Sequence, residues 1–160
     1  MAVKFKVEGM KELERSLKKL GKVPQKHVTA SARKGMNISL KDARANAPHE
    51  TEALKKGIVL KGEKSRLKAK KAYRIVFDRA MNDVFQKPIK NPGSRGGVGN
   101  KTGYYPISQE YGYFAGDGNY IPGFRFVSDS LTDNVRGIEK TIVSTMKTKI
   151  DEEIRKAGLK

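Results

Sequence analysis

Few residues of the chain have the types and spacing that catalysis or metal binding requires. His27 and His49 are the only histidines, and neither has a carboxylate or a second histidine at a metal-binding helical spacing. A catalytic triad needs a nucleophile, a base and an orienting acid, and composition alone leaves His49 with a distant serine open. The residue types favour a protein that is not an enzyme and uses no cofactor.

Two glycine-containing segments have the composition of ligand-binding loops, but they lack the neighbouring residues that such loops require. The glycines of residues 93–99 precede Lys101 and Thr102, but Asn100 interrupts the pattern and no hydrophobic strand precedes it. Backbone N–H groups would then have no scaffold that aims them at a phosphate. Residues 117–119 indicate a turn, because a calcium loop needs further carboxylates. Neither segment is predicted to be a site.

The residues best suited to bind a partner are cations. Lys and Arg number 34 against 17 Asp and Glu, a formal net charge of +17. Residues 1–50 carry +7 and residues 51–103 carry +10, whereas residues 104–160 hold 8 basic and 8 acidic groups. If the positive charge served only solubility, it would not be absent from the last third of the chain. The asymmetry therefore favours a basic face that binds a polyanion.

The densest cationic segment is residues 55–74, with nine Lys or Arg and one acid, Glu63. Its first aromatic residue is Tyr73, so the segment lacks side chains that would stack on single-stranded bases. Two kinds of contact therefore stay open for this segment. One is contact with nucleic-acid phosphates, which does not depend on base sequence and is weakened by salt, and the other is contact with an acidic protein surface. The residues predicted to make this contact are Lys61, Lys64, Arg66, Lys68, Lys70, Lys71 and Arg74.

Length and composition set the class of molecule. The 160 residues fit one domain, residues 1–160. The absence of cysteine excludes disulfides, cysteine-based zinc fingers and thiol chemistry. No stretch approaches the roughly 18 apolar residues of a membrane span, and the N-terminus lacks the apolar core of a secretory signal. We expect a soluble intracellular product with no membrane partner.

The first fifty residues predict a strand and two helices. Residues 3–7 alternate apolar and polar as a short strand does, and apolar residues at spacings of three and four predict a helix over 10–21. A second helix begins near Pro24, which suits a first turn, and ends before Pro48. Its predicted buried face consists of Val28, Ala32, Met36, Leu40, Ala43 and Ala47.

The pattern changes from helix to strand in the residues that follow. Residues 58–60 and 72–78 predict two antiparallel strands, which makes 55–74 a basic β-arm with a long cationic connection. We expect that connection to be mobile until a polyanion or a neighbouring subunit orders it. Residues 86–103 hold two prolines and five glycines and predict a flexible loop.

The neutral last third is predicted to join copies of the chain. Five of the six tyrosines lie between 104 and 120, and apolar residues recur at helical spacing over 123–157. One helix of that length would measure about 50 Å, so either Gly137 bends it or its far end packs on another chain. The fold class is α+β: a small antiparallel sheet with a long basic β-hairpin arm, two N-terminal helices and a long C-terminal helix. The predicted subunit interface consists of Tyr105, Tyr111, Tyr113, Ile142, Met146 and Ile150.

Short motifs along nearly the whole chain resemble one family. They are Val7-Glu8-Gly9-Met10-Lys11-Glu12-Leu13, then Ala45-Asn46-Ala47-Pro48 with Thr51, then Leu54-Lys55-Lys56-Gly57-Ile58. Glu110-Tyr111-Gly112 and Ile121-Pro122-Gly123-Phe124-Arg125 follow in the second half. Together they are similar to the tail-completion, or neck, proteins of long-tailed bacteriophages and prophages, from whose pattern Glu52, Tyr113 and Gly123 depart.

The resemblance implies a structural protein of the virion, made in the host cytoplasm, that joins the DNA-filled head to the tail. It implies a homo-oligomeric ring of about six copies, with duplex DNA in the lumen. Its neighbours would be portal, adaptor or stopper proteins on one side and tail-tube or tail-terminator proteins on the other. The alternative is a free accessory protein that binds nucleic acid without sequence preference. The residues expected to be architectural are Pro48, Thr51, Leu54, Ile58, Glu110, Gly112, Pro122 and Phe124.

Overall fold

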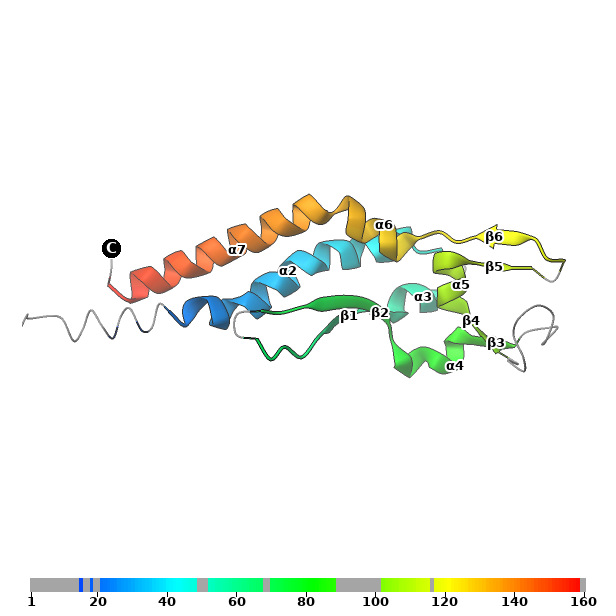
Figure 1. Cartoon of the computed structure of the whole chain (residues 1–160), viewed down its shortest axis with the longest axis horizontal. Coiled ribbons are helices and arrows are strands. Elements are labelled where there is room, and N and C mark those ends of the chain that lie inside the picture. Colours follow the sequence, from blue (N-terminus) through cyan, green and yellow to red (C-terminus); the bar gives the residue numbers. More distant parts are fainter. Residues whose placement is uncertain are drawn as a thin grey trace, which may run out of the picture.

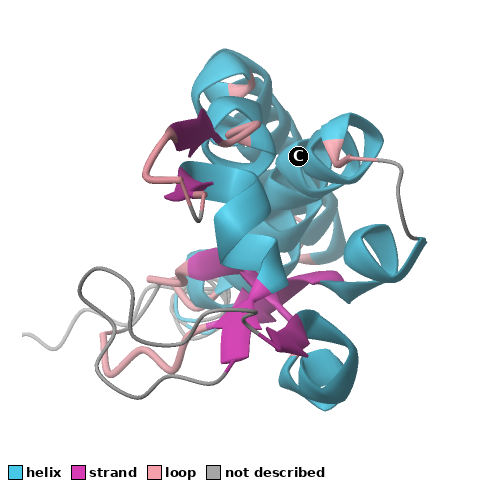
Figure 2. Ribbon diagram, turned by 90° about the vertical axis from the view of Figure 1, so that its right-hand side faces the viewer, coloured by secondary structure: helices cyan, strands magenta, loops and turns pink. Residues whose placement is uncertain are grey.

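The computed structural model describes residues 15, 18, 21–48, 52–67, 70–88, 102–115 and 117–158. Within them the protein is α+β and elongated, with two long helices side by side, one strand pair alongside them and two further strand pairs at one end (Figure 1). Seen along that axis, helices make up most of the cross-section and the pieces of sheet stay small (Figure 2). The strand predicted over 3–7, most of the helix over 10–21, Thr51, Lys68 and residues 89–101 lie outside the described residues.

Helix α2, Val23–Asn46, begins and ends where the sequence predicts. Pro24 lies in its first turn, and Ala47 leaves the helical conformation just before Pro48. This follows from the physics of proline, which is tolerated where no N–H is needed but disfavours helix in the residue before it. The described helices are α2, α3 (Glu52–Gly57), η1 (Arg79–Met81), α4 (Asn82–Phe85), α5 (Tyr105–Tyr111), α6 (Phe126–Asp133) and α7 (Val135–Lys156).

The C-terminal segment is two helices, so the prediction of one helix over 123–157 is wrong. The chain leaves the helical conformation at Asn134, between α6 and α7, and not at Gly137. The Asn134 side-chain amide donates to Asp42 Oδ2 at 2.7 Å and to Ser130 O at 2.9 Å. It thereby ties the break to α2, and α7 runs back along α2 (Figure 1).

The predicted buried face of α2 is confirmed at Ala43 and Ala47, whereas along the preceding turns it is displaced by about one position. The most buried positions are Ser31, Gly35, Ser39 and Ala43, every fourth residue, while most of the larger residues beside them are half-buried. The reason is close helix packing: a Cβ built on Gly35 would lie 2.6 Å from Ile142 Cγ1 of α7. Ser39 Oγ also donates to Ser130 O of α6 at 2.9 Å. Only small side chains fit at such a contact.

Within the described residues, three separate two-stranded antiparallel sheets replace the single small sheet that the sequence predicts. Their strands are short because turns and helices interrupt the chain between them, and each pair joins neighbouring segments. The pairs are β1 (Ile58–Gly62) with β2 (Tyr73–Phe77), β3 (Gln86–Pro88) with β4 (Thr102–Tyr104), and β5 (Gly112–Phe114) with β6 (Tyr120–Pro122).

The core lies where α2, α3, α6 and the β1–β2 pair meet. Leu54, Ile58 and Phe126 are at most 2% exposed there, and Tyr105 packs against them from the side. Phe77 stacks edge-on against Phe126 at 6.2 Å between ring centroids, a favoured aromatic geometry. Leu54 and Ile58 are thus core residues.

Two glycines on the long helices give a matched test of the close packing. Gly35→Ala should destabilise the protein by about 1–3 kcal/mol, because the added methyl group forces α7 away from α2. Gly137→Ala, where a Cβ meets nothing within 4 Å, should stabilise it by about 0.5–1 kcal/mol through helix propensity. Urea unfolding followed by circular dichroism measures both, and equal effects would contradict the packing described.

Candidate functional site

The first candidate surface is the cationic side of the β1–β2 pair. Lys61 lies opposite Arg74 in the register, at the end of the pair away from the core. The described cations of the predicted contact are exposed except Lys71, which is half-buried. An open hollow of about 610 Å³ lies here, lined by Lys61, Gly62, Glu63, Lys64, Arg74, Val76, Phe77 and Arg79. Arg79, which sequence reasoning missed, adds a cation because η1 follows directly after β2.

Glu63 organises part of this cationic surface. Arg74 Nε lies 2.7 Å from Glu63 Oε1, and Lys71 Nζ donates to Glu63 O at 2.6 Å while lying 5.8 Å from the centroid of the Tyr73 ring. Both cations are therefore held in place within the hairpin. Among the described residues, Lys61, Lys64, Arg66 and Lys70 present their charge to solvent.

The strands are anchored to α2 from the opposite face. Arg44 donates from Nε and Nη2 to Ile58 O, at 2.9 Å and 2.6 Å, which holds the start of β1 on the helix. Ile75 and Phe77 pack against the core, and Tyr73 Oη donates to Thr29 O at 3.2 Å. Tyr73, Ile75 and Phe77, at alternate positions of the strand predicted over 72–78, therefore share the face of β2 that turns toward α2 and the core.

A second candidate feature is a buried carboxylate that caps helix α6. Glu110, in α5, is 2% exposed. Its carboxylate accepts from the backbone N–H groups of Val127 and Ser128, both at 2.9 Å, and from Ser128 Oγ at 2.6 Å. The first N–H groups of a helix have no partner within it, and the helix dipole favours negative charge there. Glu110 therefore fixes the start of α6 from a separate helix.

The two motifs of the second half meet at this cap. The backbone N–H groups of Phe124 and Arg125 donate to Gln109 O at 2.8 Å and Glu110 O at 3.0 Å. Gly112 has φ 88°, and a side chain there would collide with Ile121 O, just as one at Gly123 would collide with Glu110 O. Glycine is needed where two backbones approach this closely.

Arg125 and Phe124 show how the chain enters α6. Arg125 has φ 52°, the left-handed region that non-glycine residues seldom adopt, and α6 begins directly after it. Phe124 contributes its backbone but its side chain is 63% exposed, whereas Phe126 is buried. The phenylalanine that the sequence indicated as architectural is thus not the one in the core.

The β5–β6 hairpin that starts at this cap carries apolar side chains on both faces. Phe114 and Tyr120 lie together, 5.3 Å between ring centroids, and Tyr113 lies opposite Ile121. Of the tyrosines predicted at a subunit interface, Tyr111 and Tyr113 are exposed here, whereas Tyr105 packs on the core. The exposed apolar residues of this aromatic hairpin are Tyr111, Tyr113, Phe114, Tyr120, Ile121 and Phe124.

The other predicted interface residues lie on α7, at the opposite end of the molecule. Ile142, Met146 and Ile150 are half-buried, and Ile142 contacts α2 of the same chain. No residue of α7 is fully buried, and Val143 is 67% exposed. Within the described chain α7 packs chiefly on α2, which leaves one side of its apolar stripe uncovered.

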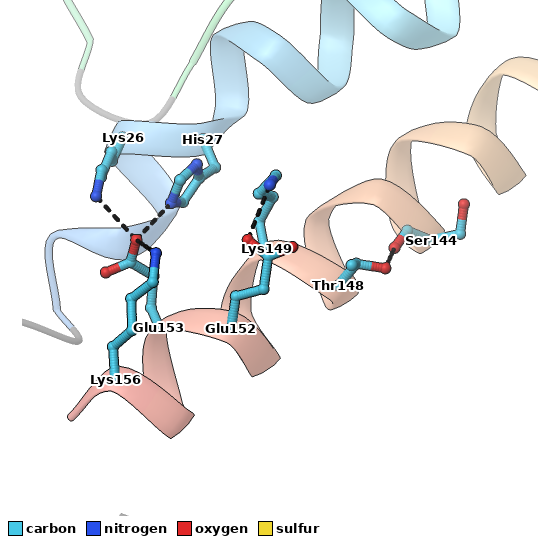
Figure 3. Close-up of polar contacts among 8 residues, drawn as sticks. All are labelled: Lys26, His27, Ser144, Thr148, Lys149, Glu152, Glu153 and Lys156. Carbon is cyan, nitrogen blue, oxygen red and sulfur yellow. Dashed lines mark hydrogen bonds and ion pairs between the residues drawn. The ribbon is translucent and has the colours of Figure 1, made fainter. Parts of the chain in front are cut away.

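Ion pairs fasten the far end of α7 to the first turns of α2 (Figure 3). Glu153 Oε1 lies 2.8 Å from Lys26 Nζ, 3.3 Å from His27 Nε2 and 3.9 Å from Lys156 Nζ. The hydrogen bond from Lys26 is the main cause that lowers the pKa of Glu153. His27 is half-buried in this contact, and His49 lies outside the described residues.

The described residues contain no group of three or more His, Asp or Glu that could hold a metal ion. None of the helices in this part of the chain is long and apolar enough to cross a membrane. Comparison with family models, with curated proteins and with solved structures gives no match. The functional interpretation therefore depends on the residues and their arrangement.

Glu110 can be tested by substitution. Glu110→Ala should lower the free energy of unfolding by about 2–3 kcal/mol, because it leaves two backbone N–H groups and a hydroxyl near the core without their acceptor. Glu110→Gln should have an intermediate effect, since one carboxamide oxygen remains. The matched control is Glu139→Gln, at an exposed position of α7. An equal change in both glutamine variants, measured by urea unfolding, would contradict the capping role.

The contact around Glu153 predicts a dependence of stability on pH. Because the folded-state pKa of Glu153 is lowered, its contribution is present above the unfolded pKa and is lost as pH falls through the folded pKa. Glu153→Gln should flatten the fall in thermal midpoint between neutral and acid pH. Asp117→Asn, in an exposed turn, is the control. An unchanged pH profile in Glu153→Gln would show that the contact does not contribute.

Proposed function

We propose that the protein is a structural component of a phage neck, which completes the tail and joins it to the DNA-filled head as a homo-oligomeric ring. In this proposal the cations of residues 61–74 and Arg79 form an arm that faces duplex DNA or the acidic surface of a neighbouring ring. The virion is then its site of action, and it has no chemistry of its own.

The observation that carries the proposal is the separation of charge from apolar surface along one elongated chain. Solvent-exposed cations lie on the β1–β2 pair and on the connection between its strands, while the exposed aromatic residues gather on the β5–β6 hairpin at one end (Figure 1). A ring around passing DNA needs cations that contact phosphates without reading sequence, and apolar anchors that join subunits. The proposal assigns DNA contact to the first surface and subunit contact to the second.

The residues of the resemblance also support a structural role. Leu54 and Ile58 form the core, while Glu110, Gly112 and Gly123 build the joint between α5, the aromatic hairpin and α6. These contacts set the direction of the chain, and an assembling subunit needs such a fixed geometry to present its surfaces to its neighbours. Pro48, at the end of α2, acts in the same way.

Reversing the charge of the arm tests the proposal. The triple variant Lys64→Glu, Arg66→Glu, Lys70→Glu should fold normally but fail to support joining of heads to tails. Its binding to duplex DNA should weaken, and the slope of log K against log salt should become less steep by about 2–3, because each replaced cation no longer neutralises a phosphate. Assembly is scored by electron microscopy and infectivity, and binding by a salt titration.

A control of equal charge change is Arg33→Glu, Lys34→Glu, Lys41→Glu, at exposed positions of α2. It should leave both readouts closer to those of the unaltered protein. Fully infectious particles from the arm variant would contradict the proposal. Tight DNA binding by the unassembled chain, with no role in particle assembly, would instead favour the free nucleic-acid-binding accessory protein.

A further inference from the structure

We propose that the β5–β6 aromatic hairpin of one copy docks on the outer side of α7 of the next copy, so that the ring contact is head-to-tail. The inference rests on the proposed function, because it assumes that copies of the chain associate. It goes further in naming which surface of each copy contacts which surface of the other.

The aromatic hairpin has the properties of an inserted element. Phe114 is 70% exposed, Phe124 63% and Tyr111 62%, and apolar residues point from both faces of a pair of three-residue strands. A two-stranded hairpin is at best marginally stable in water unless its apolar face is covered. A contiguous group of exposed aromatic residues marks an interaction site more often than ordinary surface.

Charge indicates what covers the hairpin. Residues 111–124 contain a single charged residue, Asp117, in a chain whose net charge is +17. A surface that binds nucleic acid would need cations to contact the phosphates, and this one has none. Two copies of so basic a chain repel each other, and they can approach only through surfaces that carry little positive charge. The hairpin is such a surface.

The outer side of α7 is the matching surface. Residues 138–154 hold 3 basic and 4 acidic groups, of which Glu153 pairs with α2, so this part of the helix is close to neutral. Val143, Met146 and Ile150 recur at three and four residues and form one aliphatic row, exposed at Val143 and half-buried at the other two. An aromatic hairpin laid across this row would cover apolar surface on both partners.

Symmetry favours pairing of these two different surfaces. A closed ring of more than two copies uses heterologous contacts, in which one patch of each subunit meets another patch of the next. The hairpin and the far end of α7 lie at opposite ends of the molecule (Figure 1). Contact between them therefore propagates from copy to copy, whereas hairpin-to-hairpin contact would end at a dimer.

Disulfide trapping tests this contact directly, because the chain contains no cysteine. The full-length Phe114→Cys variant is mixed with Val143→Cys, Met146→Cys or Ile150→Cys, each purified separately, at high salt that screens the repulsion. Mild oxidation should give a mixed disulfide dimer with at least one of the three. We expect about tenfold more of it than with Leu67→Cys in place of Phe114→Cys. Leu67 is 64% exposed on the β1–β2 connection and serves as the matched control.

Three results would overturn the proposal. Absence of mixed dimer with all three α7 variants would exclude the contact, as would equal trapping with Leu67→Cys. Predominant dimers of Phe114→Cys with itself would show hairpin-to-hairpin pairing instead. A second measurement does not depend on cysteine: Phe114→Ser with Phe124→Ser should lower self-association in sedimentation, whereas Leu67→Ser should not.

Failure of the proposed contact between the aromatic hairpin and α7 can be distinguished from failure of the proposed function. If the proposed function is wrong, the arm variants join heads to tails normally, whatever the trapping result. If only the head-to-tail contact is wrong, the arm variants still block joining while no hairpin–α7 disulfide forms. Melting curves of each variant confirm that the substitutions, all but Met146 and Ile150 at exposed positions, leave the fold intact.

Discussion

The Glu110 carboxylate joins α5, at the base of the aromatic hairpin, to the start of α6. Burying a carboxylate is unfavourable unless donors surround it, and here two backbone N–H groups and a hydroxyl of α6 supply the bonds. The same residue accepts, through its carbonyl, from the Arg125 N–H that precedes α6. One residue thus fixes both the base of the aromatic hairpin and the start of the helix. Phe126 then reaches the core, and α6 is placed against α2.

The course of the C-terminal half follows from that placement. The backbone carbonyl of Ser130, in α6, accepts from Ser39 Oγ of α2 and from the Asn134 side chain. The last turn of α6 is therefore hydrogen-bonded to α2 where the helix ends. Helix α7 then returns along the small residues of α2 and is fastened at its far end by Glu153. The cationic surface depends on different contacts, chiefly Arg44 with the start of β1. The two surfaces that the proposed function needs can therefore be altered independently.

Sequence rules predicted the elements that local physics controls. Proline positions marked both ends of α2, because proline constrains the backbone of its own and the preceding residue. The pattern of residues 72–78 predicted the strand that the structure shows as β2. The short motifs pointed to Glu110, Gly112, Leu54 and Ile58, all of which have structural roles. The contact predicted for the cationic residues remains a prediction, as does the ring.

What the chain alone determined, then, is the extent of α2, the strands β1 and β2, and which thirds of the chain carry charge. The break at Asn134 and the strands β3 and β4, at the two ends of the segment predicted as a loop, were not predicted. Tertiary structure decided which phenylalanine is buried, why Asn134 and not Gly137 separates α6 from α7, and why Ser31, Gly35 and Ser39 are more buried than the larger residues beside them. Each of these outcomes depends on a residue about a dozen to a hundred positions away: Glu110 for α6, Asp42 for Asn134, Ile142 for Gly35. Local periodicity carries no information about such partners, because they become neighbours only when the helices pack.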